Sequence, residues 1–255
     1  NIDIHMMRNI EWGAVTYLYH SKYGRCTNGT CEELTINNCS TYTTGIGADE
    51  VSASSSSTTC TTDKNKYNGE SGVKASTTGN VYGVYDISGG SYEYTMGNMV
   101  NSSNQFYTSR AENWSTTTTP LAKYYDSYTY NTSSTTYTRG RLGDAIVEMA
   151  PRGAVGNWYS DEANFPYSAY SWFIRGGNYN FGKYAGAFNF KQIYGFAGSD
   201  DSFRASLGAQ ASWSQSTLWV GRWLSWSFLS NYNVCDQERW DPFHLTVSDV
   251  VNQFK

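Results

Sequence analysis

The sequence predicts an α+β fold that is rich in loops, with few helices and short antiparallel strands. Three observations predict this class. Apolar residues recur at helical spacing near the start of the chain, short β-prone runs separated by glycines follow residue 170, and long stretches rich in Ser, Thr, Asn and Gly show no periodicity. A chain of 255 residues is long enough to bury a sizeable core.

The first twenty residues predict a helix. Their apolar positions stand close to helical spacing, at Ile4, Met7, Trp12, Val15 and Leu18. Asp3 is a candidate cap at the start of this helix, and Gly24 with the polar run behind it is expected to end it.

Residues 24–80 predict long loops held by disulfides. Four cysteines lie there among Thr, Ser, Asn and Gly, where a thiol has little core to hide in. The preferred pairs are Cys26 with Cys31, which closes a short turn, and Cys39 with Cys60, which closes the loop carrying SASSSSTT. Four reduced thiols in a disordered or cytosolic loop are the alternative.

A zinc site fits these cysteines less well than disulfides. No pair has the CxxC spacing of a zinc knuckle, and His20 is the only nearby imidazole. Cys235, far along the chain, has no assigned partner.

The later elements are expected to be short strands. Within 81–94, Val81, Gly83, Tyr85 and Ile87 alternate as in a strand, which a turn at Gly89-Gly90 would break. Residues 101–138 hold no clear element, and LGDAIVEMA (142–150) fits a strand or a short helical turn. Further strands are expected at SWFIRGG, GAFNF and SFRASL.

The chain is expected to comprise one domain, residues 1–208, and an aromatic extension, residues 209–255. The extension is dense in Trp and Phe and carries a helical stripe at Val247, Val250, Val251 and Phe254. It packs against the domain or contacts a partner, another copy of the chain included; both interpretations stay open.

Composition excludes some classes of partner. Charged residues make up only 16% of the chain, and the formal net charge is −4. Because no run of Lys or Arg occurs, the cationic patch needed for nucleic-acid binding is missing. No stretch of about 20 apolar residues occurs, so no membrane span is expected.

The location is expected to be extracellular or on the cell surface. The neutral, hydroxyl-rich composition and the expected disulfides are both typical of proteins outside the cell. Because the sequence begins at Asn1 rather than at Met, we interpret the chain as part of a longer precursor.

Four stretches, taken in order, resemble the formylglycine-generating-enzyme-like (sulfatase-modifying factor) domains. EWGAV resembles the end of the family's EAEWEYAA helix, GVYDISGGSYEYTMGN its GLYDMSGNVWEW signature, FIRGG its RGGSW motif, and SFRASL its closing GFR strand. The resemblance covers residues from about 5 to 206. It implies the C-type-lectin-like fold, an α+β fold that is heavy in loops.

The residues of these motifs are expected to serve folding rather than catalysis. Asp86 can accept hydrogen bonds from backbone amides at a bend, and paired glycines allow backbone conformations that a Cβ would bar. Glu93 stands between two tyrosines and needs a cationic partner, either Arg175 or Arg204. The expected structural residues are Asp86, Gly89, Gly90, Glu93, Arg175, Gly176, Gly177 and Arg204.

The catalytic residues of the resembled family are not matched here. The formylglycine-generating enzymes use a cysteine pair between the RGG and FR motifs to hold copper, whereas no cysteine lies between Gly177 and Phe203. The iron-dependent sulfoxide synthases of the superfamily use three histidines, whereas His5, His20 and His244 have no close spacing. We therefore expect no enzymatic activity and no cofactor, with a divergent oxidoreductase as the least favoured alternative.

Two pairs of adjacent acids remain, Asp161-Glu162 and Asp200-Asp201. On loops such pairs are expected to be solvated rather than catalytic. They are the candidates for a structural calcium ion, which binds through loop oxygens.

Residues 170–206 predict a recognition surface. Binding surfaces use Tyr, Asn, Ser and Gly, because rigid aromatic rings bury area at small entropic cost and amides adapt their hydrogen bonds. Phe188 and Phe190 are expected to point inward, and the alternative is that most of these rings belong to the core. The candidate ligand-binding residues are Trp172, Asn178, Tyr179, Asn180, Phe181, Tyr184, Asn189, Gln192 and Tyr194.

These observations predict a secreted or surface-displayed binding module of bacterial or phage origin, of receptor or adhesin type. Its ligand is a protein, peptide or glycan. The segment after RGG also resembles the variable region of proteins that are diversified by retroelements. The alternative from a different class is a pilin-like structural subunit of a surface appendage, which would assemble with copies of itself.

Overall fold

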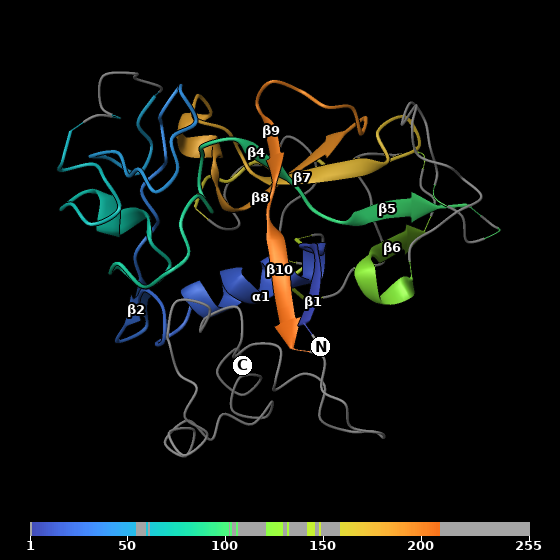
Figure 1. Ribbon diagram of the computed structural model, residues 1–255, viewed down its shortest axis with the longest axis horizontal. Coiled ribbons are helices and arrows are strands. Elements are labelled where there is room, and N and C mark those ends of the chain that lie inside the picture. Colours follow the sequence, from blue (N-terminus) through green and yellow to red (C-terminus); the bar gives the residue numbers. More distant parts are fainter. Residues whose placement is uncertain are drawn as a thin grey trace, which may run out of the picture. The chain divides into compact units, whose positions relative to one another are not determined.

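The computed structural model describes residues 2–54, 60, 62–101, 103, 106, 121–129, 132, 142–145, 148 and 159–209. These residues form an α+β structure with one α-helix, short strands and many loops (Figure 1). The chain divides into two compact units, Met6–Arg204 and a second made of Asn1–His5 and Ala205–Lys255. The predicted extension, with its helical stripe and Cys235, lies outside the described residues, except for Ala209.

The helix begins later than predicted. Asp3 and Ile4 lie in strand β1 (Ile2–Met6), and helix α1 (Asn9–Tyr19) starts only after Arg8. The stretch IDIHM alternates apolar and polar residues, which is the period of a strand rather than of a helix. The prediction of Asp3 as a cap was therefore wrong. The cap is Arg8, whose backbone amide donates to the Glu11 carboxylate at 2.9 Å.

The helix also ends earlier than predicted, at Tyr19 rather than near Gly24. The backbone amide of His20 donates to the Thr16 carbonyl at 3.0 Å, and the chain then turns. The amide of Arg25 closes this turn on the Tyr19 carbonyl at 2.8 Å.

The central sheet of the Met6–Arg204 unit contains four strands in the order β8-β7-β4-β9 (Figure 1). Strand β7 is antiparallel to both β8 and β4, whereas β9 is parallel to β4. The strands span Tyr92–Tyr94 (β4), Trp172–Gly176 (β7), Gly186–Ile193 (β8) and Asp201–Phe203 (β9). The strands predicted at SWFIRGG and GAFNF are thus confirmed. The single strand predicted at SFRASL is instead divided at Arg204 into β9 and a second strand, Ala205–Ala209, in another sheet.

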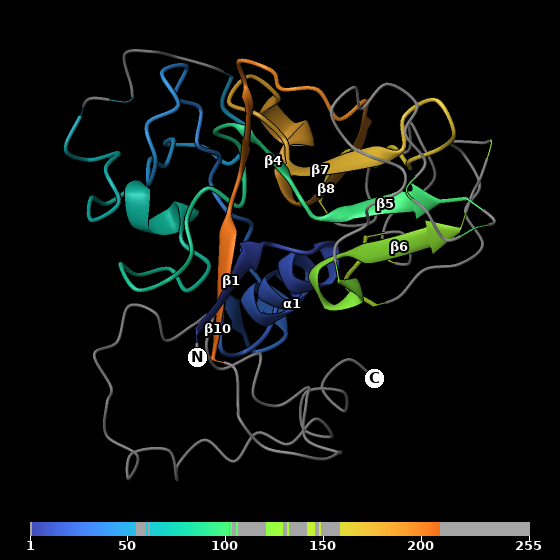
Figure 2. The same ribbon diagram turned by 45° about the vertical axis from the view of Figure 1, so that its right-hand side comes forward.

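The remaining sheets have two strands each. Strands β5 (Gly97–Val100) and β6 (Asp126–Thr129) pair in parallel and lie side by side (Figure 2). Strand β6 falls in a stretch where no element was predicted. Strands β2 (Cys26–Thr27) and β3 (Thr30–Cys31) form a hairpin, and β10 (Ala205–Ala209) pairs with β1. Of the stretch 142–150, residues 142–145 form a turn.

Helix α1 packs against β8. Its buried residues include Trp12, whose indole nitrogen donates to the Ala187 carbonyl at 2.8 Å. Gly13 lets the backbone of α1 lie close to the backbone of Gly143, because a Cβ at position 13 would lie 1.8 Å from the Gly143 carbonyl oxygen. Phe188 and Phe190 point into this core, as predicted, and are 1% and 0% exposed.

Arg175 lies at the centre of the core and is fully buried. Its guanidinium donates to the Asn9 side chain at 2.7 Å and to the carbonyls of Asn189 and Ala187 at 2.9 and 3.3 Å. Burial lowers the pKa of Arg175 to about 10. Its many donors are thus used to tie α1 to β8, a structural role as predicted.

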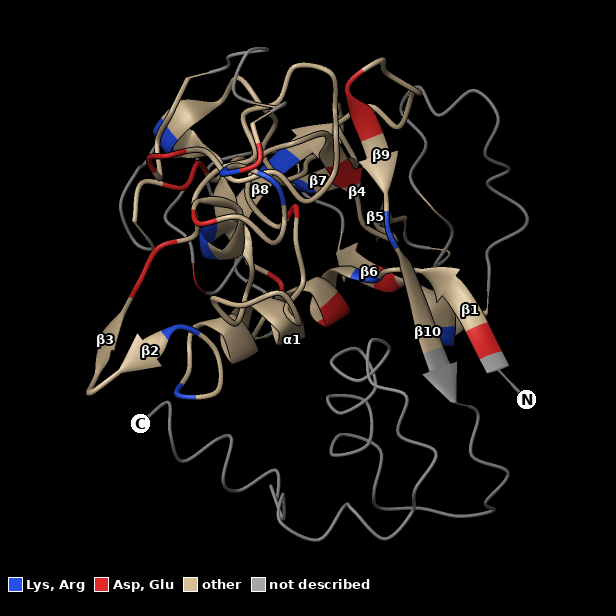
Figure 3. Ribbon diagram, turned by 60° about the vertical axis from the view of Figure 1, so that its left-hand side comes forward, with Lys and Arg blue, Asp and Glu red and all other residues tan. Residues whose placement is uncertain are grey.

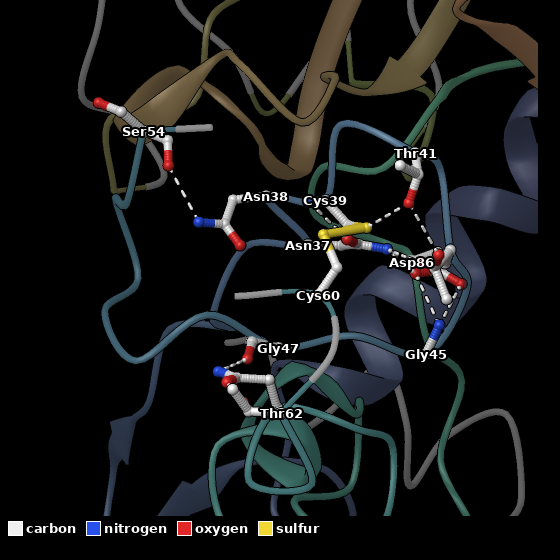
Figure 4. Close-up of a disulfide and its surroundings, with 12 residues drawn as sticks. Asn37, Asn38, Cys39, Thr41, Gly45, Gly47, Ser54, Cys60, Thr62 and Asp86 are labelled. Atoms are coloured by element: carbon white, nitrogen blue, oxygen red, sulfur yellow. Dashed lines mark hydrogen bonds between the residues drawn. A yellow bond between two sulfur atoms is a disulfide. The ribbon is translucent and has the colours of Figure 1, made fainter. Parts of the chain in front are cut away.

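The motif GVYDISGG forms a bend and not the predicted strand. Asp86 has a left-handed backbone (φ 59°), which interrupts the extended chain, and the strand starts only after Gly89 and Gly90 (φ 77° and 75°). The Asp86 carboxylate accepts from the Gly45 amide at 3.1 Å and from the Asn37 side chain at 2.7 Å (Figure 4). Asp86 therefore joins this bend to a loop far away in the sequence.

Of the two partners predicted for Glu93, the structure selects Arg204. The guanidinium donates to both carboxylate oxygens, at 2.6 and 2.7 Å, and also to the Tyr85 carbonyl at 3.0 Å. Burial raises the pKa of Glu93, and the charge of Arg204 acts against that rise. This ion pair connects β4 to the end of β9.

Both predicted disulfides are present, Cys26–Cys31 and Cys39–Cys60. The second closes the loop between Cys39 and Cys60 (Figure 4), whose described residues 40–54 contain no helix or strand. The short 3-10 helix η2 (Gly72–Ala75) follows. The two bonds are compatible with an extracellular protein. Among the described residues, no helix has the length and apolar character needed to cross a membrane.

Candidate ligand-binding face

The loop after β7 carries most of the predicted ligand-binding residues. Gly176 and Gly177 (φ 84° and 71°) turn the chain out of the sheet, and it continues into the 3-10 helix η4 (Gly182–Tyr184). The Tyr179 amide donates to the Gly90 carbonyl at 2.7 Å. The loop is therefore fixed to the bend that precedes β4.

Four aromatic rings gather on this loop and beside it. We call Tyr42, Tyr179, Phe181 and Tyr184 the aromatic face. The rings of Tyr42 and Tyr179 meet edge to face at 5.4 Å, and those of Phe181 and Tyr184 lie 6.2 Å apart. Tyr184 is 40% exposed, and the other three are half-buried. All four residues are thus partly accessible to solvent.

Phe181 anchors the aromatic face to the core. It packs against a small buried cluster that contains Ile36, Ala48 and Ala185. Its ring also meets the buried ring of Tyr92 edge to face at 5.7 Å. Removing Phe181 would therefore disturb packing as well as the surface.

Two lysines lie over these rings. The Lys191 ammonium stands 4.9 Å from the centre of the Tyr92 ring and 5.0 Å from that of Phe181, and it donates to the Tyr92 hydroxyl at 3.2 Å. The Lys183 ammonium stands 5.3 Å from the centre of the Tyr184 ring. All three distances to the ring centres fall within the range of cation–π contacts.

Two carboxylates border the aromatic face, where β9 begins with acidic residues (red in Figure 3). Asp200 accepts a hydrogen bond from the Asn178 side chain at 3.1 Å. Burial, together with the negative charge of Asp200, raises the pKa of Asp201 to about 6. Burial also raises the pKa of Tyr42, as do Tyr179 and these two carboxylates, so the acids lie close to the rings.

Two of the predicted ligand-binding residues are not on any exposed face. Trp172 is 6% exposed and packs edge to face on Phe106 at 5.7 Å. Asn189 is fully buried, and its amide donates to the Tyr184 carbonyl at 2.8 Å. These predictions were wrong, because an aromatic or amide side chain in a strand can equally complete the core.

Tyr194 belongs to a second aromatic group. Its ring lies 4.0 Å from that of Tyr170, to which its hydroxyl is hydrogen-bonded, and 6.1 Å from that of Phe196. Gln192, in β8 opposite Phe173, is half-buried. Eight of the nine predicted residues thus separate into the loop Asn178–Tyr184, this second group and the core, and the ninth is Gln192 in β8.

The acidic pair Asp161-Glu162 is not solvated as expected. Asp161 is 1% exposed and accepts from the Phe188 amide at 2.9 Å, while its carboxylate occupies the space that a side chain at Gly186 would fill. Burial raises the pKa of Asp161 well above its usual range. Asp161 is therefore buried, whereas Glu162 beside it is half-buried.

Sequence reasoning missed Tyr42, Lys183, Lys191 and Tyr92 as neighbours of the loop. Tyr42 stands in a Thr-rich stretch between Cys39 and Cys60, with no local pattern that marks it. Its one distinctive property is structural, a left-handed backbone at φ 56°. The expected disulfide was the only signal that this distant segment is held in place.

Comparison of the chain with protein-family models, with curated proteins and with solved structures finds no match.

Proposed function

We propose that this chain is a secreted or surface-displayed binding module that takes a protein, peptide or glycan ligand on its aromatic face. One observation carries the proposal. Segments far apart in the sequence deliver Tyr42 and the Tyr179–Tyr184 loop to the same surface, where their rings are in contact yet partly open. Such rings bury area on binding at small entropic cost.

The face is held in one conformation before any ligand arrives. Tyr42 is kept at φ 56°, a backbone conformation that non-glycine residues adopt at some cost and that is common at binding sites. The Tyr179 amide is bonded to Gly90, and Phe181 is packed on the core. A rigid face loses little freedom on binding, which favours affinity.

Polar groups around the rings supply hydrogen bonds and charge of both signs. The exposed Asn180 and the half-buried Asn178 offer amides, Asp200 offers a carboxylate, and Lys183 offers an ammonium group. An aromatic centre with a polar rim is typical of recognition surfaces.

We further propose that Met6–Arg204 has the C-type-lectin-like fold of the family it resembles. Three of the four resembling stretches supply adjacent strands of one sheet, β4, β7 and β9. The Glu93–Arg204 pair joins two of these motifs. Because the cysteine pair and the histidine set of the family's enzymes are not matched in the sequence, the proposed role is binding rather than catalysis.

The proposal is tested by finding a ligand and mapping where it binds. The purified chain is applied to arrays of glycans and of surface proteins, and hydrogen exchange is measured with and without the best ligand. We expect added protection at residues 39–45 and 177–185, the segments that carry the aromatic face. Protection confined to residues 167–170 and 194–196, the second aromatic group, would contradict the proposed site.

A further inference from the structure

A second cluster of functional side chains lies at the end of α1, apart from the aromatic face. A nitrogen of His20 and the sulfur atoms of Cys26 and Cys31 all lie within 4.8 Å of one another. The hairpin that carries the cysteines stands beside the C-terminal end of the helix (Figure 3). The sequence argued against zinc because no cysteine pair has CxxC spacing and His20 is the only nearby imidazole. In the structure that imidazole lies beside the sulfurs of Cys26 and Cys31.

The fold brings these three groups together through a turn and a hairpin. After the helix, the Cys26 amide donates to the Ser21 carbonyl at 3.1 Å, which folds the chain back toward His20. In the hairpin, Cys26 pairs directly with Cys31 across a turn at Asn28-Gly29, both with positive φ (53° and 82°). This register places the two cysteine side chains on the same face of the hairpin.

The surroundings fix the ligand groups and leave them accessible. The His20 ring meets the rings of Tyr159 and Phe188 edge to face, at 5.9 and 6.1 Å. The Tyr159 hydroxyl donates to the Cys31 carbonyl at 3.3 Å. All three ligand residues are only partly buried, so an ion from solvent can reach them.

We propose that reduction of the Cys26–Cys31 bond converts this hairpin into a zinc site. A thiol or phosphine reductant supplies two electrons, the S–S bond breaks, and two protons complete two thiols. Zn²⁺ then displaces both thiol protons and forms two Zn–S bonds and one bond to His20, with water in the fourth position. Two thiolates and an imidazole are a ligand set that zinc prefers.

The His20 nitrogen already lies within 4.8 Å of both sulfurs. The two sulfurs are bonded to each other in the oxidised hairpin. With Zn–S bonds of about 2.3 Å and tetrahedral angles, the sulfurs of a zinc site lie about 3.8 Å apart. The proposal therefore requires the cysteine side chains to rotate apart once the bond is reduced.

The test measures the alkylation rate of each cysteine in the reduced, folded chain, with and without Zn²⁺. Peptide mass spectrometry then reports each site separately. We expect Zn²⁺ to slow alkylation of Cys26 and Cys31 by about tenfold or more, because a thiolate bound to the metal is not free to attack the alkylating reagent. Cys39 and Cys60 in the same digest serve as internal controls.

Two variants separate the site from unspecific thiol binding. His20→Gln is expected to lose most of the protection, whereas His5→Gln, at the other histidine of the described residues, keeps it. Equal rates with and without Zn²⁺, or full protection in His20→Gln, would overturn the proposal.

Cobalt provides a second measurement on the reduced wild-type chain, independent of how the His20 variant folds. We expect sulfur-to-cobalt charge transfer and the ligand-field bands of a tetrahedral site, both lost in the variant Cys26→Ser/Cys31→Ser. No such bands in the wild type, or bands that persist in this double variant, would also overturn the proposal.

Discussion

At the scale of single residues, the ion pair of Glu93 and Arg204 is the clearest test of the core. Replacing Arg204 by Met leaves a buried carboxylate without its cation. We expect a loss of about 3 kcal/mol in the free energy of unfolding, as is usual when one partner of a buried pair is removed. Urea denaturation measures it.

The matched control is the double variant Glu93→Met/Arg204→Met, which removes both charges. It should be less destabilised than Arg204→Met alone, because no unpaired charge remains. If the loss in the double variant equals the sum of the losses in Arg204→Met and in the single variant Glu93→Met, the two side chains do not act as a pair.

A second residue-scale prediction concerns Asp201, whose pKa burial raises to about 6. The folded chain then holds this proton more tightly than the unfolded chain, where the pKa is about 3.9. This group's contribution therefore favours folding at low pH and is lost as the pH rises from about 4 to 6. The variant Asp201→Asn has no titrating group at this position and therefore loses this contribution to the pH dependence of stability.

NMR titration of the Asp201 carboxyl group measures its pKa directly. Urea denaturation midpoints at about pH 4 and about pH 6 show whether this pKa changes the stability of the fold. The variant Asp201→Asn should show a flatter pH dependence of stability than the wild type. A titration midpoint near 4 in the folded chain would contradict the account.

At the scale of elements, the two disulfides should differ in what they contribute. Cys39–Cys60 joins residues 21 apart, whereas Cys26–Cys31 joins residues 5 apart. In the chain-entropy estimate, removing the first costs about 3 kcal/mol and removing the second about 2 kcal/mol. Cys39 and Cys60 also form a buried cluster with Ile46, which adds to the difference.

Double Cys→Ala variants, compared by urea denaturation, test this order, and a non-reduced digest establishes the pairing. A larger loss for the Cys26–Cys31 variant would contradict it. Free thiols at Cys39 and Cys60 in protein purified without reductant would also remove the main support for an extracellular location.

The elements show where sequence patterns suffice. Strands β7 and β8 were predicted, because their aromatic-rich runs are bounded by glycines, Gly176-Gly177 at the end of β7 and the single Gly186 at the start of β8. The strand expected before Gly89 was not found, because the hydrogen bonds of Asp86 to Asn37 and Gly45 hold that stretch in a bend. The alternation of residues 81–87 could not reveal that Asp86 has a hydrogen-bond partner more than forty residues away in the sequence. At the start of the chain, the alternation of IDIHM was the overlooked signal for β1.

At the scale of the whole molecule, the candidate site was only half predictable. The composition of residues 178–184 marked them as a recognition loop, and the structure leaves them partly exposed. Their neighbours Tyr42 and Tyr92 come from segments that only the tertiary structure brings together. Conversely, Trp172 and Asn189 were assigned to the surface because composition does not distinguish a ring or amide that completes the core.

The central claim is that the aromatic face binds the ligand, and one affinity measurement tests it most directly. The variant Tyr42→Ala/Tyr179→Ala/Tyr184→Ala removes the face but keeps Phe181, which anchors the loop. A matched control, Tyr23→Ala/Tyr67→Ala/Tyr82→Ala, removes three exposed rings elsewhere, which are 38%, 54% and 55% exposed. Unchanged circular dichroism establishes that both variants are folded.

The dissociation constant for the ligand found on the arrays is then compared across the three proteins. Aromatic anchors contribute about 2 kcal/mol or more at such surfaces, and 1.4 kcal/mol is about tenfold in affinity. We therefore expect the face variant to bind at least about 100-fold more weakly than the wild type, and the control to bind within about twofold. A folded face variant that binds as tightly as the wild type would contradict the claim.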